Sequence, residues 1–176
     1  MQEEKTLLRN KVFSGRIIDV YDDKVTLPDG KTAGREYVNH NGGVCVVALN
    51  DHDEVYIVKQ YRYPYREEVI EIPAGKLEKG EDPLSAGKRE LSEEAGVSAE
   101  NFEFLGEFYP SPGYTNERIY MYLATGLSET HQNLDEDEFL TAEKIKLTEL
   151  CEKIMSGEIK DGKTVAAVLK TVLRRK

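Results

Sequence analysis

The hydrophobic and polar positions of the chain predict short strands and a few helices. Residues 11–38 alternate apolar and polar positions, which is the pattern of half-buried strands. The apolar members of this alternation are Val12, Ile17, Val20, Val25 and Leu27. Between two strand-like halves, Pro28-Asp29-Gly30 supplies turn chemistry, so we predict a small antiparallel β unit.

Apolar runs become denser from Gly42 onward. Val44–Leu49 and Val55–Tyr61 flank a turn at Asn50–Glu54, and this arrangement predicts a β-hairpin. Four further strands are predicted at Val69–Ile72, Phe102–Tyr109, Ile119–Ala124 and Phe139–Ile145.

Helix signals occur at three places. Asp82 before Pro83 is typical of an N-cap followed by a helix, and Gly96 is typical of a helix end, so Pro83–Ala95 is predicted to be helical. Amphipathic patterns predict further helices at Leu147–Met155 and Thr164–Leu173. This order of elements predicts a mixed sheet with helices packed on it, an α/β or α+β sandwich. We expect an N-terminal β unit at residues 1–40, too short to bury its own core, and the main domain at 41–176.

The composition indicates a globular protein and narrows its function. Of 176 residues, 33 are acidic and 24 basic, which gives a formal charge of −9, and 39% are hydrophobic. Because such a surface repels phosphodiester backbones, we exclude nucleic-acid binding as the main task. An acidic enzyme acting on an anionic substrate would need metal ions as mediators.

Two features predict the compartment. The longest apolar run has about six residues, well short of the roughly 20 that cross a bilayer, so we expect no membrane span. Met1–Arg9 lacks the basic-then-apolar pattern of a signal peptide, and we therefore expect a cytoplasmic location. Cys45 and Cys151 are predicted to be two reduced thiols without a metal-binding partner.

Three glutamates on one predicted helix carry the strongest chemical signal. Glu90, Glu93 and Glu94 stand at positions i, i+3 and i+4 and therefore share one helix face. A solvated acidic face is one interpretation. However, like charges at these spacings repel, and they crowd the C-terminal turn, where the helix dipole is already negative. Both penalties disappear if a divalent cation binds there, and oxygen ligands without Cys or His favour Mg²⁺, Mn²⁺ or Ca²⁺.

The same region resembles the signature of the Nudix hydrolases. Gly75, five residues, Glu81, seven residues and Arg89-Glu90-Leu91-Ser92-Glu93-Glu94-Ala95-Gly96-Val97 match it at every fixed position. The resemblance implies an α/β/α sandwich whose loop–helix–loop segment binds two or more Mg²⁺ or Mn²⁺ ions against a diphosphate. It implies Glu90, Glu93, Glu94 and the Ala74 carbonyl as metal ligands, with Arg89 and Glu93 acting in catalysis.

Several fixed positions of this signature also have a local physical explanation. Arg89 can orient the carboxylates through bidentate pairing. Gly75 and Gly96 are predicted to permit tight turns, while Leu91 and Val97 are predicted to anchor the helix to the sheet.

Segments outside the signature resemble the ADP-ribose pyrophosphatase branch of this family. Pro112 lies 15 residues after Val97, a distance that marks this branch. Val58–Pro64 and Glu71–Gly75 also resemble segments of ADP-sugar hydrolases. From the residues alone, Pro112 could mark a plain turn. The substrate contacts that the resemblance implies are Arg35, Arg62, Glu71, Ser111, Gly113 and Glu117.

Two of these contacts have more specific expected roles. Arg62 would contact the adenine or phosphate end of the substrate, and Glu117 would hydrogen-bond the terminal ribose. Without the resemblance, Arg62 would be an ordinary snorkelling side chain and Glu117 a surface carboxylate.

The acidic run Asp135–Glu138 could be a solvated loop or a source of catalytic carboxylates. By the resemblance, Glu136 would deprotonate the attacking water and Glu138 would complete a metal site. The two roles could be exchanged.

The resemblance implies hydrolysis of ADP-ribose to AMP and ribose 5-phosphate. Alternatives are another nucleoside diphosphate derivative, such as a different ADP-sugar, GDP-mannose or NADH, or a non-catalytic nucleotide sensor. The branch also implies a homodimer in which the N-terminal unit is swapped and helps form the neighbour's site. Exposed apolar strands that need a partner surface agree with this expectation.

Overall fold

A computed structural model describes residues 2–134 and 138–175 of the chain. The chain forms two compact units. One contains the residues up to Gly42 together with Tyr109–Arg118, and the other contains Gly43–Phe108 and the residues from Ile119 onward. The loop at 109–118, which we expected in the main domain, therefore groups with the N-terminal strands.

The first unit is an antiparallel sheet. Its strands are β1 (Lys5–Leu8), β2 (Lys11–Ser14), β3 (Ile18–Thr26) and β4 (Thr32–His40). β3 and β4 form a hairpin whose turn includes Gly30 at φ 85°, as Pro28-Asp29-Gly30 predicted. β1 and β2 each pair with part of β3, and β1 was not predicted.

This sheet buries very little of its apolar surface. Among its described residues, Val25 is the one buried hydrophobic side chain. Five others are more than half exposed, namely Leu7, Leu8, Val12, Phe13 and Ile17. The predicted lack of an independent core is therefore confirmed.

The second unit contains two sheets. The first has the order β8-β5-β10-β9, and the second has the order β11-β6-β7. The strands of the first are β8 (Ala74–Lys76), β5 (Gly43–Ala48), β10 (Ile119–Glu129) and β9 (Val97–Phe108). Those of the second are β11 (Leu140–Lys146), β6 (Glu54–Arg62) and β7 (Glu67–Glu71). β5 and β10 pair in parallel and the other pairs are antiparallel, so the mixed sheet is confirmed.

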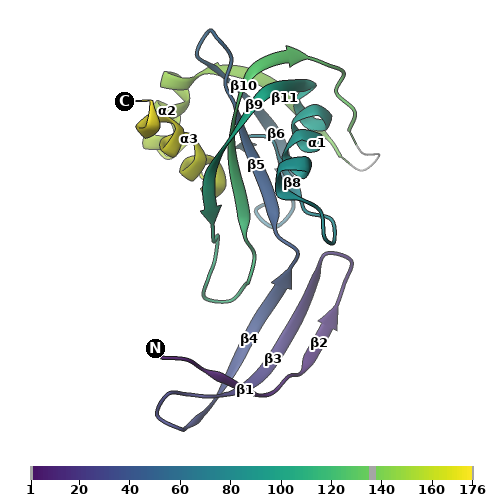
Figure 1. Cartoon of the computed structure of the whole chain (residues 1–176), viewed down its shortest axis with the longest axis vertical. Helices are drawn as coiled ribbons and strands as arrows, with labels where there is room; N and C mark the ends of the chain where they lie inside the picture. The colour runs from purple at the N-terminus through teal and green to yellow at the C-terminus, as the bar shows by residue number, and fades with distance from the viewer. Residues whose placement is uncertain (1, 135–137, 176) are drawn as a thin grey trace. The chain divides into compact units, whose positions relative to one another are not determined.

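Helices cover both faces of the first sheet of this unit (Figure 1). They are α1 (Pro83–Ala95), α2 (Leu147–Met155) and α3 (Gly162–Arg174). Successive residues of β5 point to opposite faces. Val44 and Val46 accordingly join the core under α1, whereas Cys45 and Val47 join the core under α2 and α3. This is the predicted α/β/α sandwich, and none of the helices in its described part is long and apolar enough to cross a membrane.

The hairpin predicted at 44–61 is wrong. The turn itself forms, because the Asn50 N–H donates to the Glu54 carbonyl at 2.9 Å and Leu49 bridges Val55. Beyond that bridge the two strands diverge into different sheets. β5 pairs with β8 and β10, while β6 pairs with β7 and β11. Two adjacent apolar runs fit this arrangement as well as a hairpin, since both strands are buried over most of their length.

Candidate active site

Helix α1 begins and ends at the predicted residues. The Asp82 carboxylate accepts the Ser85 N–H at 2.9 Å, and Pro83 follows it at the first helical position. Gly96 adopts the left-handed conformation, with φ 62° and ψ 38°, and its N–H donates to the Ser92 carbonyl. Leu91 in α1 and Val97, the first residue of β9, are both fully buried in the core between the helix and the sheet. The caps therefore fix the two ends of the helix, and the buried side chain of Leu91 anchors it to the sheet.

Two of the three predicted glutamates are buried. Glu90 is 7% exposed and Glu94 is 3% exposed, and the Ala74 N–H donates to Glu94 Oε2 at 2.8 Å. Burial is the main cause that raises the pKa of Glu94 to about 8; the charges of Glu90, Glu138 and Glu71 also raise this pKa, and the hydrogen bond from Ala74 lowers it. Burial also raises the pKa of Glu90, against the lowering effect of Arg89. The solvated acidic face is therefore excluded for Glu90 and Glu94.

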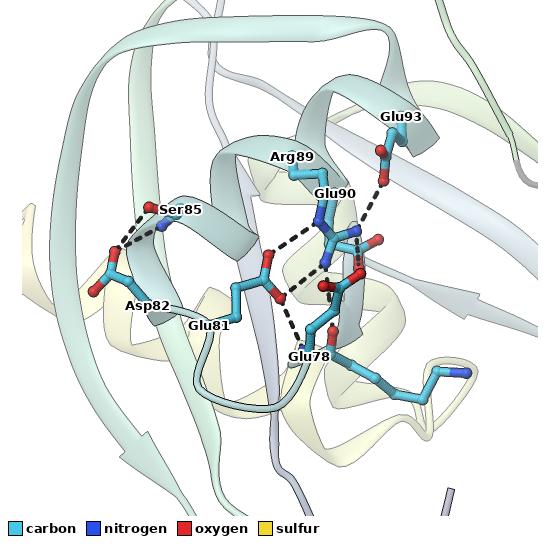
Figure 2. Close-up of polar contacts among 8 residues, drawn as sticks. Glu78, Glu81, Asp82, Ser85, Arg89, Glu90 and Glu93 are labelled. Carbon is cyan, nitrogen blue, oxygen red and sulfur yellow. Dashed lines mark hydrogen bonds and ion pairs between the residues drawn. The ribbon is translucent and has the colours of Figure 1, made fainter. Parts of the chain in front are cut away.

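Arg89 joins three carboxylates (Figure 2). Its Nη1 donates to Glu90 Oε1 at 2.8 Å and to Glu93 Oε2 at 2.9 Å. Its Nε donates to Glu81 Oε1 at 3.1 Å. This bond is the main reason that the pKa of Glu81 lies below its usual range. Arg89 Nη2 also donates to Glu81 Oε2 at 3.3 Å, so Arg89 pairs bidentately with Glu81, as predicted, and binds Glu90 and Glu93 through Nη1.

Gly75 makes room for the Glu90 carboxylate. A Cβ atom on Gly75 would lie 1.8 Å from Glu90 Oε1. The tight turn expected at Gly75 is wrong, because this residue lies within β8 and pairs with Val44 in β5. The glycine is required by a close approach between side chain and backbone that the sequence spacing does not reveal.

Arg62 and Glu71 form a bidentate ion pair. Arg62 Nε donates to Glu71 Oε1 at 2.5 Å, and Nη2 donates to Oε2 at 2.7 Å. Glu71 is 2% exposed, whereas the Arg62 side chain is 37% exposed. Burial alone would raise the pKa of Glu71, but the hydrogen bond from Arg62 and the charge of Lys163 outweigh burial and lower it. Both Glu71 oxygens are thus engaged by protein cations.

The donor set around α1 fits a hard divalent cation. Glu90, Glu94 and Glu138 repel one another, which is the origin of part of the raised pKa of Glu90 and Glu94. A divalent ion would relieve this repulsion, and carboxylate oxygens are the ligands that Mg²⁺ and Mn²⁺ prefer. In residues 2–134 and 138–175, no three acidic, His or Cys side chains already converge on a common metal position. Mg²⁺ usually keeps several waters and takes substrate phosphate oxygens as further ligands.

The remaining predicted site residues fall into two groups. Ser111, Gly113 and Glu117 lie in the unit that also contains Arg35. In that unit Arg35 Nε donates to Glu4 Oε2 at 2.8 Å, and Glu117 Oε1 lies 3.6 Å from His40 Nδ1. Glu136 lies outside the described residues, so its role as a base stays a prediction.

Sequence reasoning missed two charged residues beside the Arg62–Glu71 pair. Lys163 donates to Glu71 Oε2 and lies 3.0 Å from Asp161 Oδ1. Asp161 is the N-cap of α3 and accepts the Thr164 N–H at 3.0 Å. Asp161 followed three residues later by Thr164 is an N-cap signal that could have moved the predicted helix start, but nothing in the sequence links Lys163 to Glu71.

The raised pKa of Glu94 predicts how stability depends on pH without metal. Its pKa is about 8 in the folded chain and near 4.5 in the unfolded chain. Between these two pH values, the Glu94 carboxyl keeps its proton in the folded state and loses it on unfolding. Stability from this group is complete below about pH 4.5 and is lost as the pH rises toward 8. In EDTA, we expect the melting temperature to fall across this window more steeply for the wild type than for Glu94→Gln. Parallel pH profiles in thermal melts would contradict the raised pKa.

Comparison with known proteins bears on this site. The NUDIX domain family matches residues 39–168. A methanol dehydrogenase activator of Bacillus methanolicus is 46% identical over 94% of this chain and 91% of its own. An ADP-ribose pyrophosphatase of Bacillus subtilis (strain 168) is 43% identical over the same shares. The solved structure of an ADP compounds hydrolase matches with a TM-score of 0.88 at 21% identity, covering 99% of this chain and 95% of that chain, which supports the fold.

Proposed function

Because the chain belongs to the NUDIX family, we propose that it hydrolyses ADP-ribose to AMP and ribose 5-phosphate with divalent metal ions, Mg²⁺ or Mn²⁺. The observation that carries the proposal is the pair of buried carboxylates, Glu90 and Glu94, beside Glu138. The relative of 43% identity that is named an ADP-ribose pyrophosphatase supports the choice of substrate.

The acidic face of α1 would hold the ions. We propose Glu90, Glu93, Glu94, Glu138 and the Ala74 carbonyl as the ligands, with Arg89 keeping Glu90 and Glu93 in place. When bound, the ions neutralise the diphosphate and lower the pKa of a bound water. Either Glu136 or Glu138 accepts the proton of the attacking water, and the other acts as a metal ligand. No covalent intermediate is required.

Several side chains are proposed to recognise the substrate. We assign Arg62 to the adenine or phosphate end of the substrate and Glu117 to the terminal ribose. Arg35, Ser111 and Gly113 are proposed to contribute further contacts. Glu71 would act through Arg62, since both of its oxygens are already bonded to Arg62 and Lys163.

A homodimer would complete the protein. The antiparallel sheet of the N-terminal strands leaves Leu7, Val12 and Phe13 more than half exposed. An apolar surface of this kind needs a partner. We propose that a second copy covers it by a swap of the N-terminal strands, which would bring Arg35 to the neighbour's site. Light scattering at micromolar concentration should give twice the 20.0-kDa chain mass, and a monomer would contradict the swap.

Phosphate release from ADP-ribose in the presence of added phosphatase tests the function. AMP and ribose 5-phosphate are phosphatase substrates, whereas the intact diphosphate is not, so phosphate should appear with Mg²⁺ and not with EDTA. An equal rate in both would contradict metal dependence.

A substrate panel tests the choice of diphosphate. The relative of 46% identity carries a different name, methanol dehydrogenase activator, so identity alone does not choose the substrate. ADP-ribose, another ADP-sugar, GDP-mannose and NADH should be ranked by kcat/KM, and we expect ADP-ribose first. Binding without turnover of any of them would instead indicate a nucleotide sensor.

A further inference from the structure

Three charged side chains lie around the carboxylate of Glu71 and form a cluster of four with it. Arg62 approaches Glu71 with two nitrogens, and Lys163 donates to Oε2, the oxygen that Arg62 Nη2 also contacts. Asp161 completes the cluster at 3.0 Å from Lys163 Nζ. Two cations and two anions balance in this cluster, while Glu71 and Lys163 are 2% and 12% exposed at their side chains.

Lys163 is held as a cation. Burial alone would lower its pKa, but the charges of Glu71 and Asp161 outweigh burial and raise it. Its position is also fixed, because it stands in the first turn of α3, two residues after the N-cap residue Asp161. Lys163 is therefore a rigid cation aimed at one oxygen of Glu71.

The first turn of α3 is tied to the strand end that carries Glu71. The Ile72 N–H donates to Thr164 Oγ1 at 3.0 Å, and Thr164 Oγ1 donates to Asp161 Oδ2 at 2.6 Å. Two residues further along the same segment, the Ala74 N–H donates to Glu94. A single short segment thus links α3 to the Arg62–Glu71 pair and to a proposed metal ligand.

We propose that Lys163 is a positioning residue for substrate binding, because it fixes the Glu71 carboxylate and through it the Arg62 guanidinium. A carboxylate with one partner can rotate about its last bond, since that torsion is broad. Two cations that approach from different elements stop this rotation. Arg62 Nη1 has no hydrogen-bond partner among the described residues, so this nitrogen is available for the substrate. The inference rests on the proposed function in that Arg62 contacts the nucleotide.

Binding of AMP, measured calorimetrically without metal, tests the proposal apart from turnover. Lys163→Met should weaken AMP binding and raise KM for ADP-ribose by about tenfold, the effect of losing a charge-assisted hydrogen bond, with kcat changed less than about threefold. In a Glu71→Gln background, Lys163→Met should weaken AMP binding by less than about a further twofold, because both changes remove the same support of Arg62.

Thr164→Val is the matched structural control. It removes the hydrogen bonds to Asp161 and Ile72 but leaves the ion pairs of Lys163, so it should lower the melting temperature and leave AMP affinity within about twofold. Equal losses of AMP affinity in both variants, or unchanged affinity in Lys163→Met, would overturn the proposal.

Asp161→Asn covers the case in which Lys163→Met does not fold. Asparagine keeps the N-cap oxygen and removes the charge that holds Lys163. AMP binding should weaken about threefold at a melting temperature close to that of the wild type, and unchanged binding in a folded Asp161→Asn would overturn the proposal. AMP binding by a wild type that does not hydrolyse ADP-ribose would contradict the proposed function alone.

Discussion

Glu94→Gln is expected to lower kcat for ADP-ribose about 10³-fold at saturating Mg²⁺, while the metal-free protein becomes at least as stable as the wild type. The loss of kcat reflects several kcal/mol of charge stabilisation in the transition state, which the metal ion held by Glu94 would supply. Stability moves the other way because burial opposes ionisation of this side chain, which is 3% exposed. The Gln carbonyl still accepts the Ala74 N–H. Phosphate release and thermal melts in EDTA at pH 8 measure the two effects.

Glu152→Gln is the control for Glu94→Gln. It makes the same chemical change on the exposed face of α2 and should leave kcat within about twofold, as is usual for surface substitutions. Turnover of Glu94→Gln within about twofold of wild type at saturating Mg²⁺ would show that Glu94 is not a metal ligand.

Opposite effects on activity and stability are typical of a residue that serves function at the expense of folding. The sequence could predict the carboxylate triplet because it depends on the spacing within one helix, and that helix is set by Asp82 and Gly96. It could not predict that Glu90 and Glu94 are nearly fully buried, since the spacing also fits a solvated face.

Strand partners were harder to predict than strands. β5 and β6 were located correctly, but their pairing was not, because the pattern of apolar residues is the same in a hairpin and in two separate sheets. The partner of β5 on one side is β10, more than 70 residues away. Local patterning contains no information about a parallel partner at that distance.

The loop at 109–118 shows the same limit. Its turn is local, and a turn was one of the two interpretations of Pro112. Its attachment depends on distant backbone groups, since the Val38 N–H donates to the Tyr114 carbonyl and the Asn116 N–H donates to the Val38 carbonyl. These bonds place Ser111, Gly113 and Glu117 in the unit of the N-terminal strands.

Lys163 was missed for a related reason. It is 92 residues from Glu71 in sequence, and a lysine in the first turn of a helix is by itself unremarkable. Only the packing of α3 against β5 and the end of β7 brings the two charges together. Residues that support a site from a distant part of the chain, such as Lys163, are therefore predicted less well than the signature residues.

Gly75→Ala is expected to reduce kcat/KM about 10²-fold or more with a modest loss of stability. Its new Cβ would lie 1.8 Å from Glu90 Oε1 and 1.9 Å from Glu90 Cδ, so the carboxylate must move. The end of a glutamate side chain can swing away without unfolding the sheet, and Gly75 does not use the left-handed backbone region that would strain alanine. Displacement of this metal ligand is expected to cost about 3 kcal/mol of transition-state stabilisation, which corresponds to the loss of about 10²-fold in kcat/KM.

Gly34→Ala separates displacement of Glu90 from a general effect of adding a methyl group to a strand. Gly34 also lies in a strand, and a Cβ there would meet nothing within 4 Å. This variant should keep kcat/KM within about twofold of wild type. Glu90→Gln should resemble Gly75→Ala in activity, and the double variant should lose little more than either alone, because both changes remove the same ligand. Additive losses, or a fully active Gly75→Ala, would show that the Glu90 carboxylate does not act from the position beside Gly75.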